Sequence, residues 1–262
     1  FFNSVSNPSA TNFTNGQGYL IRMPNTHPTT PTVWNGNFDG VPNNGYYPIT
    51  LTNAGSTKRF NLLGNPYPSP INMTQFVTDN NTKITGTLYF WRKTNGAGTA
   101  YCTWAGGTFV TNSNAQTVNP NGIIQTGQGF FVEALNASTS IQFNNTQRVS
   151  NTTGQFFKTK QPVTERSTVW LNASNTLGDF SQMAVGYITD ATSGVDVFDG
   201  KYYNDSEFAL NTLLNNEEYV IQGRPLPFDV SDVVPLAFKT TTAGNYSIAI
   251  DHTEGLFSEN QD

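Results

Sequence analysis

Two histidines, one cysteine and a few carboxylates are the residues of this chain that could act as bases, nucleophiles or acids. His27 and His252 each lie in a polar stretch with no nucleophile motif beside them. The sequence contains none of the short motifs that mark serine hydrolases, zinc peptidases, P-loop proteins or dinucleotide-binding proteins. Cys102 has aromatic neighbours, which favours a small buried hydrophobic residue over an activated thiol. We therefore predict no catalytic residues and a protein that is not an enzyme.

The carboxylates form two groups in the second half of the sequence. Asp196, Asp199 and Asp205 fall within ten residues, and Glu217 is followed by Glu218. A pair of acids can hydrolyse glycosides on a β-sandwich. The Asp199-Gly200 pair is more simply a turn and the glutamate pair a solvated strand edge. Catalysis by these acids would require a pocket in which they converge.

A bound calcium ion is the alternative to a chain without cofactors. Residues 35–40 (NGNFDG) match the first half of an oxygen-ligand loop, but Tyr46 stands where the loop would need a bidentate glutamate. We interpret this stretch as an asparagine-rich turn. The group of Asp196, Asp199 and Asp205 is a second place for a structural calcium. Our main prediction is that the chain holds no metal and no cofactor.

Exposed aromatic residues could form a platform for carbohydrate. Trp34, Tyr46 and Tyr47 are the candidates, because they lie in loop-like sequence where binding residues concentrate. Trp91 and Trp104 belong to strand-like segments, whose aromatic residues are needed for packing.

Composition and charge limit the partners of the chain. Charged residues make up 12% of its 262 residues, about half the usual fraction in soluble domains. The net charge of −5 and the scattered lysines and arginines argue against nucleic acid. The single cysteine excludes an internal disulfide. No apolar run approaches the roughly 18 residues of a membrane helix, so we expect no transmembrane segment. The first residues lack an initiator Met and a signal peptide, and we interpret the chain as an interior piece of a longer protein.

The elements that must position these side chains are short strands. Alternating and β-branched or aromatic segments recur between turn signals such as Asn35-Gly36, Asn95-Gly96 and Asn121-Gly122. The clearest strand candidates are residues 18–23, 85–93, 129–134, 168–172 and 246–251. We predict an all-β protein of two consecutive antiparallel β-sandwich domains, jelly-roll or immunoglobulin-like, with at most short helical turns.

Three segments depart from the strand pattern. Residues 205–216 space their apolar side chains as a helix does, so we predict a short helix or helical turn there. Residues 62–70 carry three prolines and should form an ordered loop leaving a strand. Residues 72–76 should form one helical turn.

Domain organisation follows from the polar stretch in the middle of the chain. Residues 1–153 are predicted to form the first sandwich, truncated on its N-terminal side, and residues 165–262 the second, continuing beyond the supplied end. Residues 154–164 would be the linker. A Gly-Gln-Gly-aromatic sequence occurs at residues 16–19 and again at 127–130, which we interpret as equivalent strand starts within one domain.

The chain resembles the region that precedes the C-terminal sorting domain in large secreted proteins of gliding and related Bacteroidota. The resemblance is carried by residues 60–72 (FNLLGNPYPSPIN), 84–93, 127–134, 169–205, 219–228 and 232–257. It implies export across the outer membrane by the type IX secretion system, with the translocon and its associated surface and shuttle proteins as partners. The sorting domain is missing from these residues, and the family shares no catalytic residues that map onto this chain.

Two functions follow as hypotheses, with an enzyme as the third and weakest. The first is a non-catalytic structural or adhesive module of a large type IX substrate, secreted or displayed at the cell surface and linked to adhesion or gliding motility. The second is a carbohydrate-binding accessory module of an exported polysaccharide-degrading enzyme, which would contact surface polysaccharide through Trp34, Tyr46 and Tyr47. Whether these aromatic side chains are exposed distinguishes the two.

Overall fold

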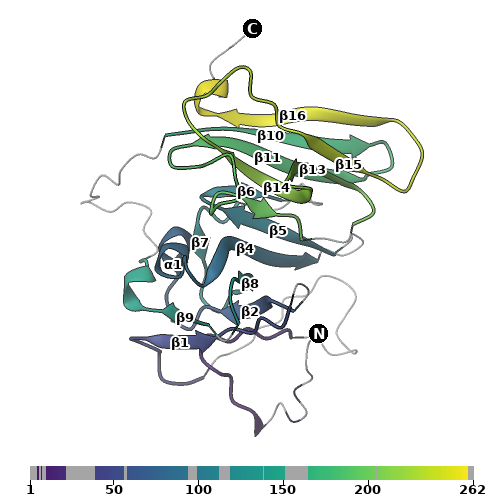
Figure 1. Ribbon diagram of the computed structural model, residues 1–262. Coiled ribbons are helices and arrows are strands. Elements are labelled where there is room, and N and C mark those ends of the chain that lie inside the picture. The colour runs from purple at the N-terminus through teal and green to yellow at the C-terminus, as the bar shows by residue number, and fades with distance from the viewer. Residues whose placement is uncertain are drawn as a thin grey trace.

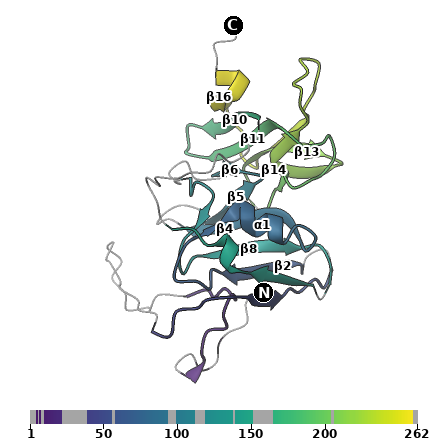
Figure 2. The same cartoon turned by 90° about the vertical axis from the view of Figure 1, so that its left-hand side faces the viewer.

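The computed structural model describes residues 5, 7, 10–21, 39–55, 58–93, 99–111, 119–137, 139–150, 165–203 and 206–258. Within these ranges the protein consists of β-strands, one short α-helix and brief 3-10 turns, so the all-β prediction is confirmed. Figures 1 and 2 show the N-terminal and C-terminal halves as two stacked layers. Among the described residues, no helix has the length and apolar character needed to cross a membrane.

The N-terminal half is built on a five-stranded antiparallel sheet. Its strand order is β2 (Phe60–Gly64), β8 (Gly129–Ala134), β4 (Ile84–Lys93), β5 (Thr99–Ala105) and β6 (Thr108–Val110). Two smaller pairs complete this half: β1 (Tyr47–Thr50) with β9 (Ser140–Phe143), and β3 (Ile71–Asn72) with β7 (Ile123–Ile124). The expected strands at 85–93 and 129–134 are thus confirmed.

Helix α1 (Met73–Asp79) closes the core of this half. The side chain of Asn72 caps it by accepting a hydrogen bond from the backbone N–H of Gln75 at 2.8 Å. Phe76 packs its ring against those of Phe130 and Phe143, and is fully buried. The expected helical turn is confirmed and extends to Asp79.

The proline-rich segment is an ordered loop after β2, as expected. The buried side chain of Asn65 accepts a hydrogen bond from the N–H of Tyr67 at 3.0 Å and donates to the carbonyl of Ser69 at 2.9 Å. These two hydrogen bonds fix the conformation of the loop, because its prolines lack the backbone N–H groups that would otherwise form hydrogen bonds. The 3-10 turn η2 (Asn145–Gln147) packs nearby, against α1.

The C-terminal half is one seven-stranded curled sheet. Its order is β15 (Leu236–Lys239), β13 (Ala209–Leu214), β14 (Glu217–Arg224), β11 (Phe180–Ile188), β10 (Arg166–Asn175) and β16 (Tyr246–Glu254), with β12 (Gly200–Lys201) beside β14. Strands β15 and β16 form opposite edges, yet the Phe238 and Tyr246 rings lie 5.2 Å apart, so the sheet curls back on itself. The 3-10 turn η3 (Gly255–Ser258) follows β16. One pair differs from the antiparallel expectation, because β11 and β14 run parallel.

The predicted helix at residues 205–216 is wrong. Residues 209–214 form strand β13, which pairs with β14 and β15. Asn215 and Asn216 both have positive φ (53° and 63°) and make the two-residue hairpin turn to β14. Phe208 and Leu210 alternate into the core of the curled sheet. Pairing on both sides therefore outweighs the helical spacing of the apolar residues.

The repeated Gly-Gln-Gly segments lie on either side of the end of β2. Gly64 pairs with Gly129, the first residue of β8, and its N–H donates to the carbonyl of Gly16 at 3.0 Å. Gly16 and Gly127 both have positive φ (81° and 71°). The first copy, however, makes only the bridge between Gln17 and Leu63, and no strand follows it up to residue 21 of the described chain.

The two halves meet across a buried interface. The outer face of the first sheet carries Phe60 and Tyr89, and the ring of Tyr203 from the second half stacks on Phe60 at 3.9 Å. Tyr89 is fully buried, and its hydroxyl donates to the carbonyl of Lys201 at 3.2 Å. Thr87 likewise donates to the carbonyl of Asp199 at 3.0 Å.

A second group of contacts extends this interface along β6. Ala105 and Val110 share one apolar cluster with Trp170 and Ile221, all of them buried. The indole N–H of Trp170 donates to the carbonyl of Phe109 at 3.0 Å. The halves are thus joined by a common core as well as by the chain. The predicted linker, residues 154–164, lies outside the described residues.

Candidate functional site

The predicted carbohydrate platform is described in part. Tyr46 is 60% exposed. Tyr47 is half-buried, and its hydroxyl lies 3.2 Å from the side-chain oxygen of Asn43, to which it donates. The ring of Tyr47 packs edge-on against Tyr67. Trp34 and His27 lie outside the described residues, as do residues 35–38 of the asparagine-rich turn predicted at 35–40.

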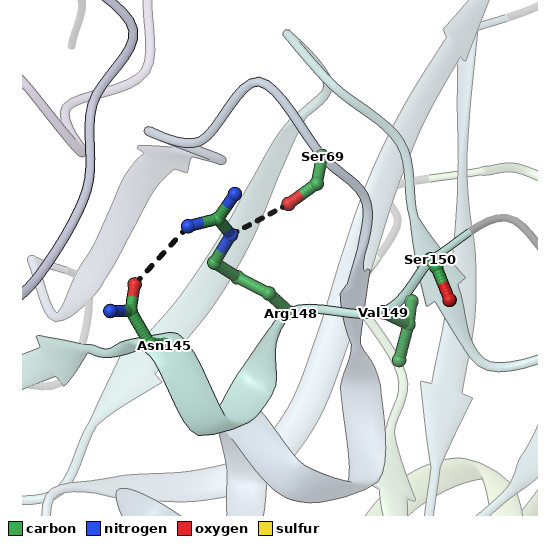
Figure 3. A pocket seen from close by; sticks show the side chains of 5 residues that line it. All are labelled: Ser69, Asn145, Arg148, Val149 and Ser150. Atoms are coloured by element: carbon green, nitrogen blue, oxygen red, sulfur yellow. Dashed lines mark hydrogen bonds between the residues drawn. The ribbon is translucent and has the colours of Figure 1, made fainter.

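A shallow pocket of about 400 Å³ is connected to the loop that carries these tyrosines through Arg148 and Asn44. Figure 3 shows Arg148 crossing it between Ser69 and Asn145, with Val149 and Ser150 on the remaining wall. The Arg148 Nε donates to Ser69 Oγ at 2.8 Å, and Nη1 donates to Asn44 Oδ1 at 2.9 Å. The guanidinium therefore occupies a fixed position at the pocket floor.

Tyr67 supports the guanidinium from below. Its ring centroid lies 5.2 Å from the Arg148 Cζ, within the range of a cation–π interaction. Burial raises the pKa of Tyr67 to about 12, with a further rise from Tyr47 and a smaller lowering by Arg148. The phenol stays neutral at physiological pH and donates its proton to the carbonyl of Gly45 at 2.6 Å.

The loop that carries Tyr46 is anchored to the same pocket. The N–H of Gly45 donates to Asn145 Oδ1 at 3.1 Å, so the exposed Tyr46 ring follows directly on a residue bonded to the pocket rim. Chemically, the pocket offers a fixed cation together with amide and hydroxyl groups. Ser69 Oγ accepts a hydrogen bond from Arg148 Nε.

His252 lies in a different place, on the outer face of β16. Its Nδ1 is 2.6 Å from Asp251 Oδ2, and its ring stacks on Trp170 with centroids 4.1 Å apart. Asn172 and Gln182 both donate to the Asp251 carboxylate. Our sequence reasoning considered His252 but missed the other four residues, because they come from three strands whose pairing no short motif indicates.

The acids predicted as a group are only partly described. Asp205 lies outside the described residues. Asp199 is 3% exposed and accepts hydrogen bonds from the N–H groups of Asp196 and Gly223. Burial raises the pKa of Asp199 to about 7, against the opposing effect of those two bonds. Asp196 instead accepts from Thr192 at 2.7 Å. In the part of the chain that the structure describes, no three potential metal ligands cluster.

The remaining candidates occupy ordinary structural positions. Cys102 is 2% exposed in the core of the first half, as expected for a small hydrophobic residue. Glu217 lies at the exposed start of β14 and forms an ion pair with Lys201 at 2.7 Å, which lowers the pKa of its carboxyl. The second glutamate, Glu218, accepts from Asn211 at 3.2 Å.

Comparison with curated proteins and with solved structures gives no match for this chain. One family model matches residues 2–262, and therefore spans both halves of the molecule and the interface between them. The chain belongs to the family described as "Domain of unknown function (DUF8693)".

Proposed function

We propose that this chain is a non-catalytic structural or adhesive module of a large exported protein, displayed at the bacterial cell surface or released from it. The route would be the type IX translocon, with its surface and shuttle proteins as partners. The resemblance of the sequence to the region before a sorting domain supports the route. The structural part of the proposal rests on one observation, the buried interface that joins the two halves.

That interface gives the module its mechanical character. A joint held by a flexible segment alone would let the halves move independently, as exposed linkers do. Here the aromatic rings of Phe60 and Tyr101 pack against the ring of Tyr203. The backbone carbonyls of Phe109, Asp199 and Lys201 accept hydrogen bonds from side chains of the opposite half. Separating the halves would leave these buried groups without partners, which costs free energy. A rigid body of this kind suits a spacer that holds other domains away from the membrane.

The export route is tested in a bacterium that produces the full-length protein. Deleting the gene for the outer-membrane translocon should move the protein from the surface and medium to the periplasm, detected with an antibody against this chain. A periplasmic enzyme serves as the lysis control. Unchanged surface display in the deletion strain would refute the route but leave the spacer role intact.

A carbohydrate-binding accessory role is the second candidate, and the exposure of the Tyr46 side chain favours it. Aromatic side chains in loops commonly bind sugar rings by stacking. Affinity electrophoresis of the purified chain in soluble polysaccharides tests this role. Retardation that disappears in Tyr46→Ala but persists in Tyr47→Phe would support it. Equal mobility of all three proteins in every polysaccharide would contradict it.

A further inference from the structure

A second cleft, of about 250 Å³, lies where the outer face of the second sheet meets the end of β6. Strands β10, β11 and β16 line it, and Figure 1 shows them stacked above β6. Six side chains define its chemistry: Trp170, Asn172, Gln182, Asp251, His252 and Glu254. We refer to it as the Asp251 cleft.

A β-bulge in β16 creates the cleft. Trp170 pairs with His252 and Leu171 with Ile250, so Asp251 is an extra residue without a partner in the ladder. The extra residue directs Asp251 and His252 to the same face of the sheet, although neighbours in a regular strand point to opposite faces. Bulges that redirect side chains are frequent beside functional sites.

The Asp251 carboxylate is held in place before any ligand arrives. Asn172 Nδ2 donates to Oδ1 at 2.7 Å, and Gln182 Nε2 donates to Oδ2 at 3.1 Å. Gln182 is itself fixed, because its Oε1 accepts from the N–H and the hydroxyl of Thr111. This chain of bonds gives the cleft a preorganised polar wall.

The groups with spare capacity in the cleft are mainly acceptors. The Asp251 side chain is 35% exposed, so its carboxylate is open to a ligand. Glu254 lines the same space and is exposed. The ligand must therefore donate hydrogen bonds, as both hydroxyl groups and ammonium groups do.

Hydrogen-bonding capacity distinguishes these two ligand classes. A carboxylate has about four lone-pair sites, and Asp251 already uses three of them on Asn172, Gln182 and His252. The one remaining site cannot satisfy the three N–H donors of an ammonium group, whereas a hydroxyl group needs a single acceptor and can itself accept.

We propose that the Asp251 cleft binds a neutral sugar ring, with hydroxyl groups donating to Asp251 and Glu254 and the ring lying beside the His252 imidazole. Trp170 is only 5% exposed, so it provides a fixed surface on which the His252 ring stacks. The His252 side chain is 52% exposed, so a ligand can reach it. This site is separate from Tyr46 and does not depend on the export route.

Nuclear magnetic resonance titration of the purified chain tests the proposal. The probes are the methyl glycosides of glucose, galactose, mannose and N-acetylglucosamine, with n-butylammonium chloride as the cationic control. We expect at least one glycoside to shift the Trp170 indole and His252 ring signals saturably at millimolar concentration, and n-butylammonium not to do so. Shifts with n-butylammonium alone, or with no probe, would overturn the proposal.

Three variants locate the binding site. His252→Ala should weaken glycoside binding by about tenfold or more, which corresponds to the loss of one good contact. Ile248→Ala, on the opposite face of the same strand, should leave binding unchanged. Glu254→Gln, at the exposed end of β16, should also weaken binding. It replaces His252→Ala as the test if His252→Ala lowers the melting temperature. Binding lost in Tyr46→Ala but retained in His252→Ala and Glu254→Gln would refute the Asp251 cleft.

Discussion

Asp199 lies in the loop before β12 and is almost completely buried beside the interface between the halves. Water cannot solvate its charge there, so burial raises the pKa of its carboxyl from 3.8 to about 7. The folded protein consequently holds this proton more tightly than the unfolded chain. The acid that we considered for catalysis or calcium binding is therefore a determinant of stability against pH.

Replacing Asp199 by asparagine should remove part of this pH dependence. Because the folded pKa is the higher one, the folded state binds more protons between pH 3.8 and about 7, and wild-type stability falls as pH rises through that window. The slope from this group is at most about 1.4 kcal/mol per pH unit. Urea unfolding at several pH values measures it. Asp190→Asn, at an exposed left-handed position where asparagine is tolerated, is the control. A decline of equal slope in Asp199→Asn would contradict the assignment.

Asp232 should show the opposite sign. The Arg224 guanidinium binds its carboxylate through Nε and Nη2, and this pairing holds the pKa of Asp232 below its ordinary value of 3.8. The stabilisation is therefore present above pH 3.8 and is lost as pH falls through the folded pKa. Asp232→Asn should lower the unfolding free energy by about 1 kcal/mol at neutral pH. The difference from wild type should shrink in acid, and a constant difference would argue against an ionic origin.

At the scale of elements, periodicity predicted strands well and failed where a hairpin turn decided the outcome. The segments at 85–93, 129–134, 168–172 and 246–251 all lie in strands, whereas residues 18–21, the described part of the segment at 18–23, form no strand. The helix prediction for residues 205–216 rests on the spacing of the apolar residues and takes no account of the Asn215-Asn216 pair. That pair is a hairpin signal, because asparagine tolerates the left-handed backbone that a two-residue turn needs. The sequence therefore contained the information for β13.

The sites were harder to predict than the strands. The exposure of Tyr46 followed from its loop sequence. The pocket around Arg148 did not, because it depends on Asn44 and Ser69, which are 104 and 79 residues away. The Asp251 cleft depends in turn on a bulge, which changes the side-chain alternation without any marker residue. Long-range strand pairing determines both, and a single sequence carries little information on such pairing.

The short helix α1 offers a test of local sequence against tertiary packing. Asn72→Ala removes the cap that satisfies the N–H of Gln75, and should lower the unfolding free energy by about 1 kcal/mol. Thr74→Ala, at an exposed position of the same helix, should have little effect. Thermal or urea denaturation measures both variants. Equal stability of Asn72→Ala and wild type would mean that packing of Phe76 alone fixes the helix.

For the whole molecule, the question is whether the two halves are independent domains. The polar stretch at 154–164 suggested a linker between two sandwiches. The interface around Tyr203 and Trp170 instead gives the halves a shared core, and one family model covers both of them. Each half therefore depends on the other to bury the apolar side chains of its facing surface.

A cut between the halves distinguishes these views. Inserting a site for a sequence-specific protease within residues 154–164 allows the purified chain to be cleaved after it has folded. We expect the two fragments to elute together on size-exclusion chromatography and to separate in denaturant, because the interface holds them. Tyr203→Ala removes the ring that stacks on Phe60 and should let the cleaved fragments separate more readily, whereas Tyr46→Ala, at an exposed position in the loop before β1, should not. Fragments that separate at once in native buffer would show that the halves are independent domains, and a spacer made from them would bend at its centre.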